Sequence, residues 1–466
     1  MIEPARATVA NMRARLDAGT LTSRDLVVMH LAQISRYDGA FHAIRCLSPS
    51  ALDDAAESDR IRASSGPRGV LEGIPILIKD NIDVAGLPTT AGALALEHNR
   101  PTVDAPIVAA VRAAGAVILG KTNLSELANF LTEGMPSGYS SLGGQVLNPY
   151  DTSLTPSGSS SGSATAAVLG FAPLTIGTET DGSITSPADH QSLVGLKPTH
   201  GLVARTGIVP IAASQDTAGP MTRTVADAAL LLSVLAPSLG SVDLGASLSG
   251  VPFSVVRGPE DADDKPSISQ LACFDTAVLA LAATGAVLTD VSIPAGEHDD
   301  ELTVLHYEFA PGVDRYLSAI GDGAPMRSLA EIQAWNEAHA EVALKFRQVH
   351  VDTAVAVDHE TEFAAYQAAR ARDLKFATDA LSTALGDREC LVFIGASGCS
   401  LAARSGWPSI VIPGGYTADS RRPVGIMLVS RPGTDARLLA LAHALERALP
   451  ARRTPFEINP AAFRGL

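Results

Sequence analysis

The chain has 466 residues, of which 46% are hydrophobic, and a formal net charge of -15 at pH 7. This length and apolar content suffice for one large α/β domain with an extensive core. The acidic balance argues against nucleic-acid binding, because phosphate contacts need clustered lysines and arginines. No stretch approaches the roughly 18 apolar residues of a membrane span, and charges interrupt the amino-terminal segment where a secretion signal would be apolar. We therefore expect a soluble cytoplasmic protein that binds neither nucleic acid nor membrane.

The first elements predicted along the chain are helices alternating with strands. Thr22 and Asp25 form a capping box before an apolar-periodic run, which predicts a helix packed by one face. Short apolar runs at 74–78 and 116–119 predict strands, and a helix begins between them near Pro106. This alternation indicates a sheet covered by helices on both faces.

The middle of the chain, from about residue 137 to 219, is rich in Gly, Ser, Thr and Pro but is interrupted by apolar runs such as 164–169. A flexible linker would lack such runs, so we expect a folded, loop-rich functional centre. The later elements predicted are strands at 251–256, 286–294, 391–395, 409–413 and 424–430, and helices at 275–283, within 329–385 and at 434–449.

We interpret residues 1–466 as a single domain in three parts. The catalytic core spans about 60–235, and a largely helical, substrate-facing excursion spans about 250–390. The strands and final helix at about 391–449 are expected to return to the core sheet.

Lys79 ends the apolar run at 74–78, which would carry its ammonium into a low-dielectric environment. Desolvation disfavours the charged amine and lowers the pKa of a lysine, which makes it a usable general base. The alternative is a lysine that emerges into solvent or pairs with the adjacent Asp80.

Two further segments supply hydroxyls and backbone amides. The run at 158–163 opens a helix and could hold an anion or a reacting oxygen, although it lacks the endings of phosphate-binding loops. A turn with an N-cap is the alternative there. In the turn from Thr180 to Ser183, successive N–H groups could form an oxyanion hole, or the glycine could simply allow a tight turn.

Other catalytic arrangements fit the sequence less well. His190 and His200 are the nearest histidines, but neither has the context of a Ser-His-Asp triad and no G-x-S-x-G motif occurs. The four cysteines are far apart without a C-x-x-C pair, which indicates free thiols. One acidic and histidine-containing cluster fits no strong metal-ligand motif: His350, Asp352, Asp358, His359 and Glu360.

Taken together, GIPILIKDNID at 73–83, PSGSSSGSATAAVLG at 156–170 and GTETDGSITSPA at 177–188 resemble the amidase-signature family. Ser159 and Ser183 are 24 positions apart, as in the family pattern. Similarity extends to segments along most of the chain: 120–130, 143–151, 195–211, 216–232 and 423–439.

The resemblance implies an α/β fold with a large twisted mixed sheet and a Ser-cisSer-Lys triad. Ser183 resembles the nucleophile, Ser159 the bridging serine on a cis peptide bond and Lys79 the base, while the amides of Thr180, Asp181, Gly182 and Ser183 would form the oxyanion hole. Neutral Lys79 would take a proton from Ser159 as Ser159 takes one from Ser183, and water would hydrolyse the acyl-enzyme after ammonia or an amine leaves. The scheme uses no metal or organic cofactor.

Within the family, SSSGSA, TETDGSIT, SQDTAGPM and NEAHA (336–340) are most similar to peptide amidases. Many members carry two glycines where this chain has Asp181 and Gly182, and an arginine where it has Thr185. We expect a small-molecule or peptide amide substrate and a monomer or homodimer. Open alternatives are an ester, carbamate or anilide hydrolase, a glutaminase component of an amidotransferase, or a binding protein without turnover.

One segment has two interpretations that the sequence does not separate. Glu308, Phe309, Arg315 and Tyr316 could border the substrate cleft, or they could belong to an ordinary amphipathic helix surface.

Overall fold

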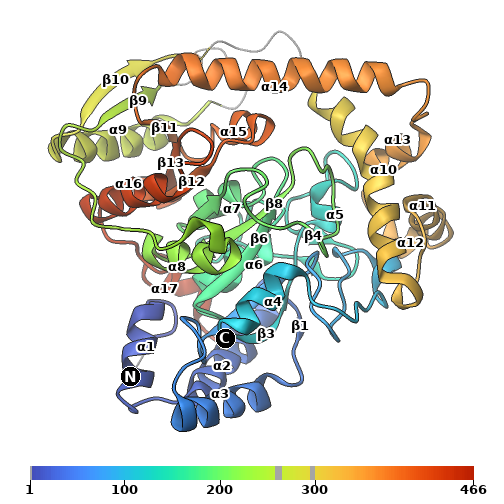
Figure 1. Cartoon of the computed structure of the whole chain (residues 1–466), viewed down its shortest axis with the longest axis horizontal. Coiled ribbons are helices and arrows are strands. Elements are labelled where there is room, and N and C mark those ends of the chain that lie inside the picture. Colours follow the sequence, from blue (N-terminus) through green and yellow to red (C-terminus); the bar gives the residue numbers. More distant parts are fainter. Residues whose placement is uncertain (1–2, 258–264, 294–299) are drawn as a thin grey trace.

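The computed structural model describes residues 3–257, 265–293 and 300–466. Within these residues, eleven strands form one sheet in the order β1-β3-β2-β6-β8-β7-β12-β13-β11-β9-β10 (Figure 1). The sheet is mixed, because β3, β2 and β6 are parallel neighbours whereas the pairs from β6 to β11 are antiparallel. The strands are β1 (Ile44–Leu47), β2 (Pro75–Lys79), β3 (Val117–Thr122), β6 (Leu174–Glu179), β7 (Val194–Lys197), β8 (Thr217–Thr222), β9 (Pro252–Val256), β10 (Val287–Val291), β11 (Cys390–Ile394), β12 (Ser409–Tyr416) and β13 (Pro423–Val429). A separate hairpin contains β4 (Tyr139–Ser140) and β5 (Gly144–Gln145).

Helices cover both faces of this sheet, because its strands are apolar on both sides. Ile76 and Ile78 of β2 pack into one hydrophobic cluster and Leu77 into another, as the period of two in a strand requires. On the first face lie α1 (Val9–Asp17), α4 (Pro106–Ala113), α8 (Val225–Leu235), α9 (Ile268–Ala283) and α16 (Asp435–Ala448). On the other lie α2 (Ser23–Phe41), α3 (Ala51–Ser65), α6 (Ser161–Val168), α7 (Thr185–His190), α14 (Phe363–Leu385), α15 (Cys399–Ser405) and α17 (Pro455–Ile458). The predicted fold class is confirmed.

A third group of helices packs beside the sheet and has its own hydrophobic core. It contains α10 (Glu301–Ile320), α11 (Leu329–Ala338), α12 (Ala340–Ala343) and α13 (Val349–Ala356), on the right in Figure 1. Phe309 and Val313 of α10 join Phe130 and Leu131 in this cluster. The group therefore rests on the loops that follow β2 and β3. The remaining short helices are α5 (Glu126–Asn129), η1 (Leu94–Leu96), η2 (Pro237–Leu239), η3 (Gly321–Gly323) and η4 (Pro460–Phe463).

The sequence predicts seven of the eleven sheet strands but not β1, β6, β7 and β8, three of which lie within the region expected to be loop-rich or at its end. The capping box of Thr22 and Asp25 is present at the start of α2. Helix α9 begins at Ile268 rather than at residue 275, because Ser267 and Gln270 form a second capping box that the apolar pattern does not reveal. The predicted strand at 286–294 is β10, although residue 294 lies outside the described residues.

Helix α10 agrees with one of the two interpretations of residues 308–316, the amphipathic helix, although the clear helical pattern begins only at residue 329. Pro311 lies inside α10 and Gly312 follows it, and both residues are unfavourable in a helix interior. The apolar contacts of α10 with the neighbouring loops override these local preferences. Among the described residues, no helix is long and apolar enough to cross a membrane.

The sheet topology brings two strand ends together. β2 and β6 are adjacent and parallel, with Ile78 opposite Ile176, so their carboxyl ends meet at the same edge. Lys79 is the last residue of β2 and Glu179 the last of β6. The loop that contains Ser183 starts directly after Glu179.

Candidate active site

Lys79 is fully buried at the end of β2, and its ammonium lies among polar groups of the adjacent segments. Its Nζ lies 2.8 Å from Ser159 Oγ, 2.8 Å from Thr178 Oγ1 and 3.2 Å from the Thr178 carbonyl oxygen. No carboxylate of the described residues forms an ion pair with it. Burial lowers the pKa of Lys79 well below its usual value, and the charges of Glu179 and Asp216 oppose that shift only in part. The geometry therefore favours a neutral amine beside the Ser159 hydroxyl.

The alternative role for Lys79, a surface lysine or a partner of Asp80, is wrong. Asp80 is fully buried and pairs instead with Lys121 of the neighbouring strand β3, whose Nζ is 3.1 Å from Asp80 Oδ1. Thr90 donates its hydroxyl proton to the other carboxylate oxygen of Asp80. The acid that follows Lys79 in the sequence is thus occupied elsewhere.

The serine-rich run at 158–163 is not a simple N-cap. Ser160 is the N-cap residue of α6, but its side chain makes no capping hydrogen bond. Instead its hydroxyl donates to the Thr178 carbonyl at 3.1 Å and accepts from the Thr178 amide at 3.2 Å. The Gly158–Ser159 peptide bond is cis, and the Ser159 carbonyl accepts a hydrogen bond from the Ser125 amide. The run is therefore fixed to the end of β6.

Ser183 lies next to this run. Its carbonyl accepts a hydrogen bond from the Ser160 amide at 3.2 Å, which places the segment carrying Ser183 against the residue that follows Ser159. Ser183 is 6% exposed, and within the described ranges its hydroxyl donates to no protein acceptor. Ser183 therefore has a hydroxyl that is almost buried but not committed to a structural hydrogen bond.

The turn before Ser183 is shaped by Glu179. The buried carboxylate of Glu179 accepts hydrogen bonds from the amides of Ile184 and Thr185, at 2.7 and 2.8 Å. Gly182 has a φ of +73°, which favours glycine, and a Cβ there would lie 3.2 Å from Cys399 Sγ, a tight contact. The backbone amides of Asp181, Gly182 and Ser183 donate no hydrogen bond to any acceptor in the described part of the chain.

The side chains flanking the turn are also held. Thr180 donates its hydroxyl proton to Asp216 at 2.6 Å, and Ser400 donates to Asp181. Burial raises the pKa of Asp216 to about 6, against the hydrogen bonds from Thr180 and two backbone amides. Burial, followed by the charge of Asp181, raises the pKa of Glu301 at the start of α10 to about 9. The turn is thus connected to both β8 and α10.

The histidines noted in the sequence lie in other surroundings. His190 Nδ1 is 3.0 Å from the Ser186 carbonyl, and His200 Nε2 is 3.1 Å from the Ala213 carbonyl. In the described ranges neither ring has a hydrogen bond to Ser183. The five residues considered for a metal are also separately engaged: His350 stacks on Phe130, for example, while Asp352 accepts from Gln333. The described residues contain no group of three or more metal-binding side chains placed to share an ion.

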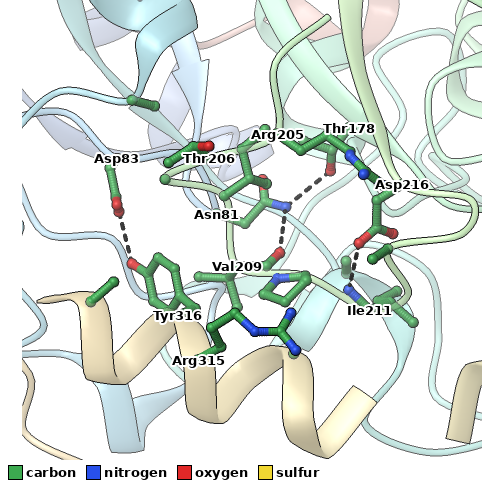
Figure 2. A pocket seen from close by; sticks show the side chains of 18 of the residues that line it. Asn81, Asp83, Thr178, Arg205, Thr206, Val209, Ile211, Asp216, Arg315 and Tyr316 are labelled. Carbon is green, nitrogen blue, oxygen red and sulfur yellow. Dashed lines mark hydrogen bonds between the residues drawn. The ribbon is translucent and has the colours of Figure 1, made fainter. Parts of the chain in front are cut away.

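A cavity of about 680 Å³ adjoins these groups (Figure 2). Asn81, Thr178 and Thr180 belong to its wall, and Asn81 donates its amide proton to Thr178 Oγ1 at 3.0 Å. Lys79, Ser159 and Ser183 do not line it themselves. The cavity therefore reaches the residues next to these three side chains and has room for a small molecule beside them.

One face of α10 forms the opposite wall. The lining positions recur at helical spacing: Tyr307, Glu308, Pro311, Gly312, Arg315, Tyr316, Ala319 and Ile320. Three of the four residues left open by the sequence, Glu308, Arg315 and Tyr316, thus border the cavity, whereas Phe309 points into the hydrophobic core. The sequence contains this periodicity, but it does not show that this helix face borders the cavity.

Comparison with known proteins identifies the family of the chain. The Amidase family model matches residues 25–384. A protein of Arabidopsis thaliana named as a probable amidase is 32% identical over 96% of this chain and 91% of its own length. A glutamyl-tRNA(Gln) amidotransferase subunit from Anaeromyxobacter dehalogenans is 33% identical over 95% of this chain and 96% of its own.

Among solved structures, a peptide amidase from Stenotrophomonas maltophilia is similar with a TM-score of 0.88 and 38% identity, covering 97% of this chain and 98% of that one. An amidase family protein from Bacillus anthracis has a TM-score of 0.89 and 33% identity, covering 97% of this chain and 92% of that one. Sequence, fold and site therefore lead to one conclusion: the chain belongs to the amidase family of enzymes.

Proposed function

We propose that the protein hydrolyses the carboxamide of a small-molecule or peptide amide through an acyl-enzyme on Ser183. The observation that carries this proposal is the contact of 2.8 Å between buried Lys79 Nζ and Ser159 Oγ, made without a carboxylate partner for the amine among the described residues. A neutral amine in that place can accept the Ser159 proton. Similarity to a peptide amidase supports the choice of substrate class.

The proton path runs through two hydroxyls. Ser183 loses its proton to Ser159 as Ser159 passes its own to Lys79, and Ser183 Oγ attacks the amide carbon. The leaving nitrogen then takes a proton back from the same relay, so ammonia or an amine departs and Lys79 is neutral again. Water then attacks the acyl carbon as Ser183 did, passing its proton through the same relay, and the carboxylic acid is released.

The uncommitted amides of the turn support the second part of the proposal. When the carbonyl carbon becomes tetrahedral, negative charge develops on its oxygen, and preorganised N–H donors stabilise that charge. The amides of Asp181, Gly182 and Ser183 have no protein acceptor among the described residues. The amide of Thr180 comes directly before them in the same turn. We assign these four amides to the oxyanion hole.

The amidotransferase component among the relatives favours glutamine as a second candidate substrate. The same relay would release ammonia from glutamine, and a partner protein would then use it. Thr185 donates both its amide proton and its hydroxyl proton to Glu179. Its role is therefore structural and does not depend on which substrate binds. Ester, carbamate and anilide cleavage would use the same acyl-enzyme.

The test is a hydrolysis panel combined with mass spectrometry of the intact protein. The panel contains peptide amides, glutamine, aliphatic amides, anilides, esters and carbamates, and quenched reactions are searched for an acyl adduct on Ser183. We expect ammonia release from peptide amides and an adduct that is lost in Ser183→Ala. Turnover of amides that persists in Ser183→Ala would refute the proposal.

A further inference from the structure

Two arginines line the cavity from opposite sides. Arg315 extends from α10, and Arg205 belongs to the loop between β7 and β8 (Figure 2). In the described part of the chain, neither guanidinium forms an ion pair with a carboxylate. Within the same residues, Arg205 donates only to the ring of His200, at 3.1 Å, and the Arg315 side chain donates to no protein acceptor. The cavity wall thus holds two cations without a direct ion pair in the described ranges, and Arg205 still lies close enough to Asp216 for its charge to lower the pKa of that carboxyl.

The acidic residues of the wall, in contrast, all have partners. Asp216 accepts from Thr180 and from two backbone amides, and Glu308 accepts from the Ser214 amide at 2.9 Å and from the Tyr366 hydroxyl at 2.8 Å. The other two are similarly engaged: Tyr316 donates to Asp83 at 2.7 Å, and Arg112 donates to Asp104 at 2.8 Å. Among the described residues, none of these four carboxylates forms an ion pair with Arg315.

The position of Arg315 is fixed by the packing of its helix. A Cβ at Gly312 would lie 3.1 Å from Pro210 Cγ, so α10 approaches the 205–211 loop closely at this point. Arg315 follows one turn later on the same helical face, toward the cavity. Its side chain is exposed, so an entering substrate can reach it.

We propose that Arg315, assisted by Arg205, binds a carboxylate that the substrate carries away from its scissile amide. This inference rests on the proposed function and names its substrate class: an amide whose other end is acidic, such as a peptide amide with a dicarboxylic acyl cap. A guanidinium offers two parallel N–H donors to a carboxylate, which suits this site. The chemical step then takes place at the ends of β2 and β6, whereas the substrate carboxylate is bound by α10.

The test compares two substrates that differ in one charge. These are N-succinyl-alanyl-phenylalaninamide and its methoxysuccinyl counterpart, in which the carboxylate is a neutral methyl ester, and ammonia release gives kcat/KM. We expect Arg315→Gln to lower kcat/KM about 10- to 100-fold for the succinyl amide, the size of a lost charge-assisted hydrogen bond, and to change the neutral substrate about 2-fold or less. Arg205→Gln should act in the same direction.

Arg24→Gln is the matched control, since Arg24 is exposed on α2 and does not line the cavity. It removes the same net charge and should leave both substrates unaffected. The inference would be overturned if Arg315→Gln lowered kcat/KM equally for the two substrates, or if Arg24→Gln lowered kcat/KM as much as Arg315→Gln does. Amide hydrolysis itself would still stand in either case.

Binding separates this inference from the proposed function. Calorimetry on Ser183→Ala measures the affinity for both amides without turnover, and we expect tighter binding of the succinyl amide that Arg315→Gln abolishes. If this difference is seen but the wild type releases no ammonia, the proposed function fails and the anion site stands. If Ser183→Ala binds both amides equally, the anion site is refuted.

Discussion

Two buried lysines on neighbouring strands have different partners. Lys121 on β3 pairs with Asp80 and also donates to the Pro88 carbonyl, at 2.9 Å. Lys79 on β2 has no such counter-ion among the described residues and contacts two hydroxyls and a carbonyl. Both side chains are fully buried. The comparison teaches that burial alone does not produce a base; the lack of a carboxylate partner is what favours a neutral amine at Lys79 in our proposal.

The largest effect that separates the two lysines concerns turnover. Lys79→Ala and Ser183→Ala should each lower kcat/KM at least about 10,000-fold, since residues of one proton relay act as a unit. Thermal unfolding should remain cooperative in both variants, because neither removes an ion pair. Ammonia release and calorimetric unfolding provide the readouts. Normal turnover in either variant would end the assignment.

The second prediction concerns stability. Lys121→Met leaves the Asp80 charge buried without a partner and should lower the free energy of unfolding by about 3–5 kcal/mol, measured by urea denaturation. The matched control is the double variant Asp80→Asn/Lys121→Met, which removes both charges and should recover part of that loss. A single variant as stable as the wild type would show that the pair is not structural.

The sequence can place Lys79 but not its surroundings. The apolar run at 74–78 predicts a buried strand, and a lysine at its end is expected to be desolvated. Which lysine pairs with Asp80 depends on the register between β2 and β3, where Ile78 is opposite Lys121, and no local pattern encodes that register. Only the tertiary contact shows which of the two lysines pairs with Asp80.

The third prediction tests the turn before Ser183. Gly182→Ala introduces a Cβ at a φ of +73° and beside Cys399, so the amides should shift and kcat should fall. Loss of an oxyanion donor typically costs about 100-fold or more in kcat. Gly19→Ala is the control, because Gly19 has a φ of +63° with nothing near its Cβ. It should share the backbone strain of about 1–2 kcal/mol but keep full activity. Equal kcat values in the two variants would contradict the role of the turn.

The fourth and smallest effect is a shift in pH dependence. Activity should fall as pH drops through the lowered pKa of Lys79, because the protonated amine cannot accept the Ser159 proton. The negative charge of Asp216 stabilises that protonated amine, so Asp216→Asn should lower the pKa of Lys79 further. The acid limb of the kcat/KM profile should then move to lower pH. Movement to higher pH would contradict this electrostatic account.

The cavity wall shows a different limit of sequence analysis. Glu308, Arg315 and Tyr316 recur at helical spacing, but Pro311 and Gly312 weaken the local helix pattern, and solvent and cleft faces look alike in sequence. The direction of Arg315 depends on the packing of α10 against loops that are distant in the chain. Conversely, the motifs at 156–170 and 177–188 are local in sequence, and they indicate the family without knowledge of the fold.

The most direct test of the central claim is the pH dependence of fluorophosphonate labelling, with the adduct located by peptide mass mapping. This reagent reports the activated hydroxyl without requiring a known substrate. Our account predicts an adduct on Ser183, with a labelling rate that falls on the acid side and is lost in Lys79→Ala. Labelling of another residue, or a wild-type rate in Lys79→Ala, would show that neutral Lys79 does not activate Ser183.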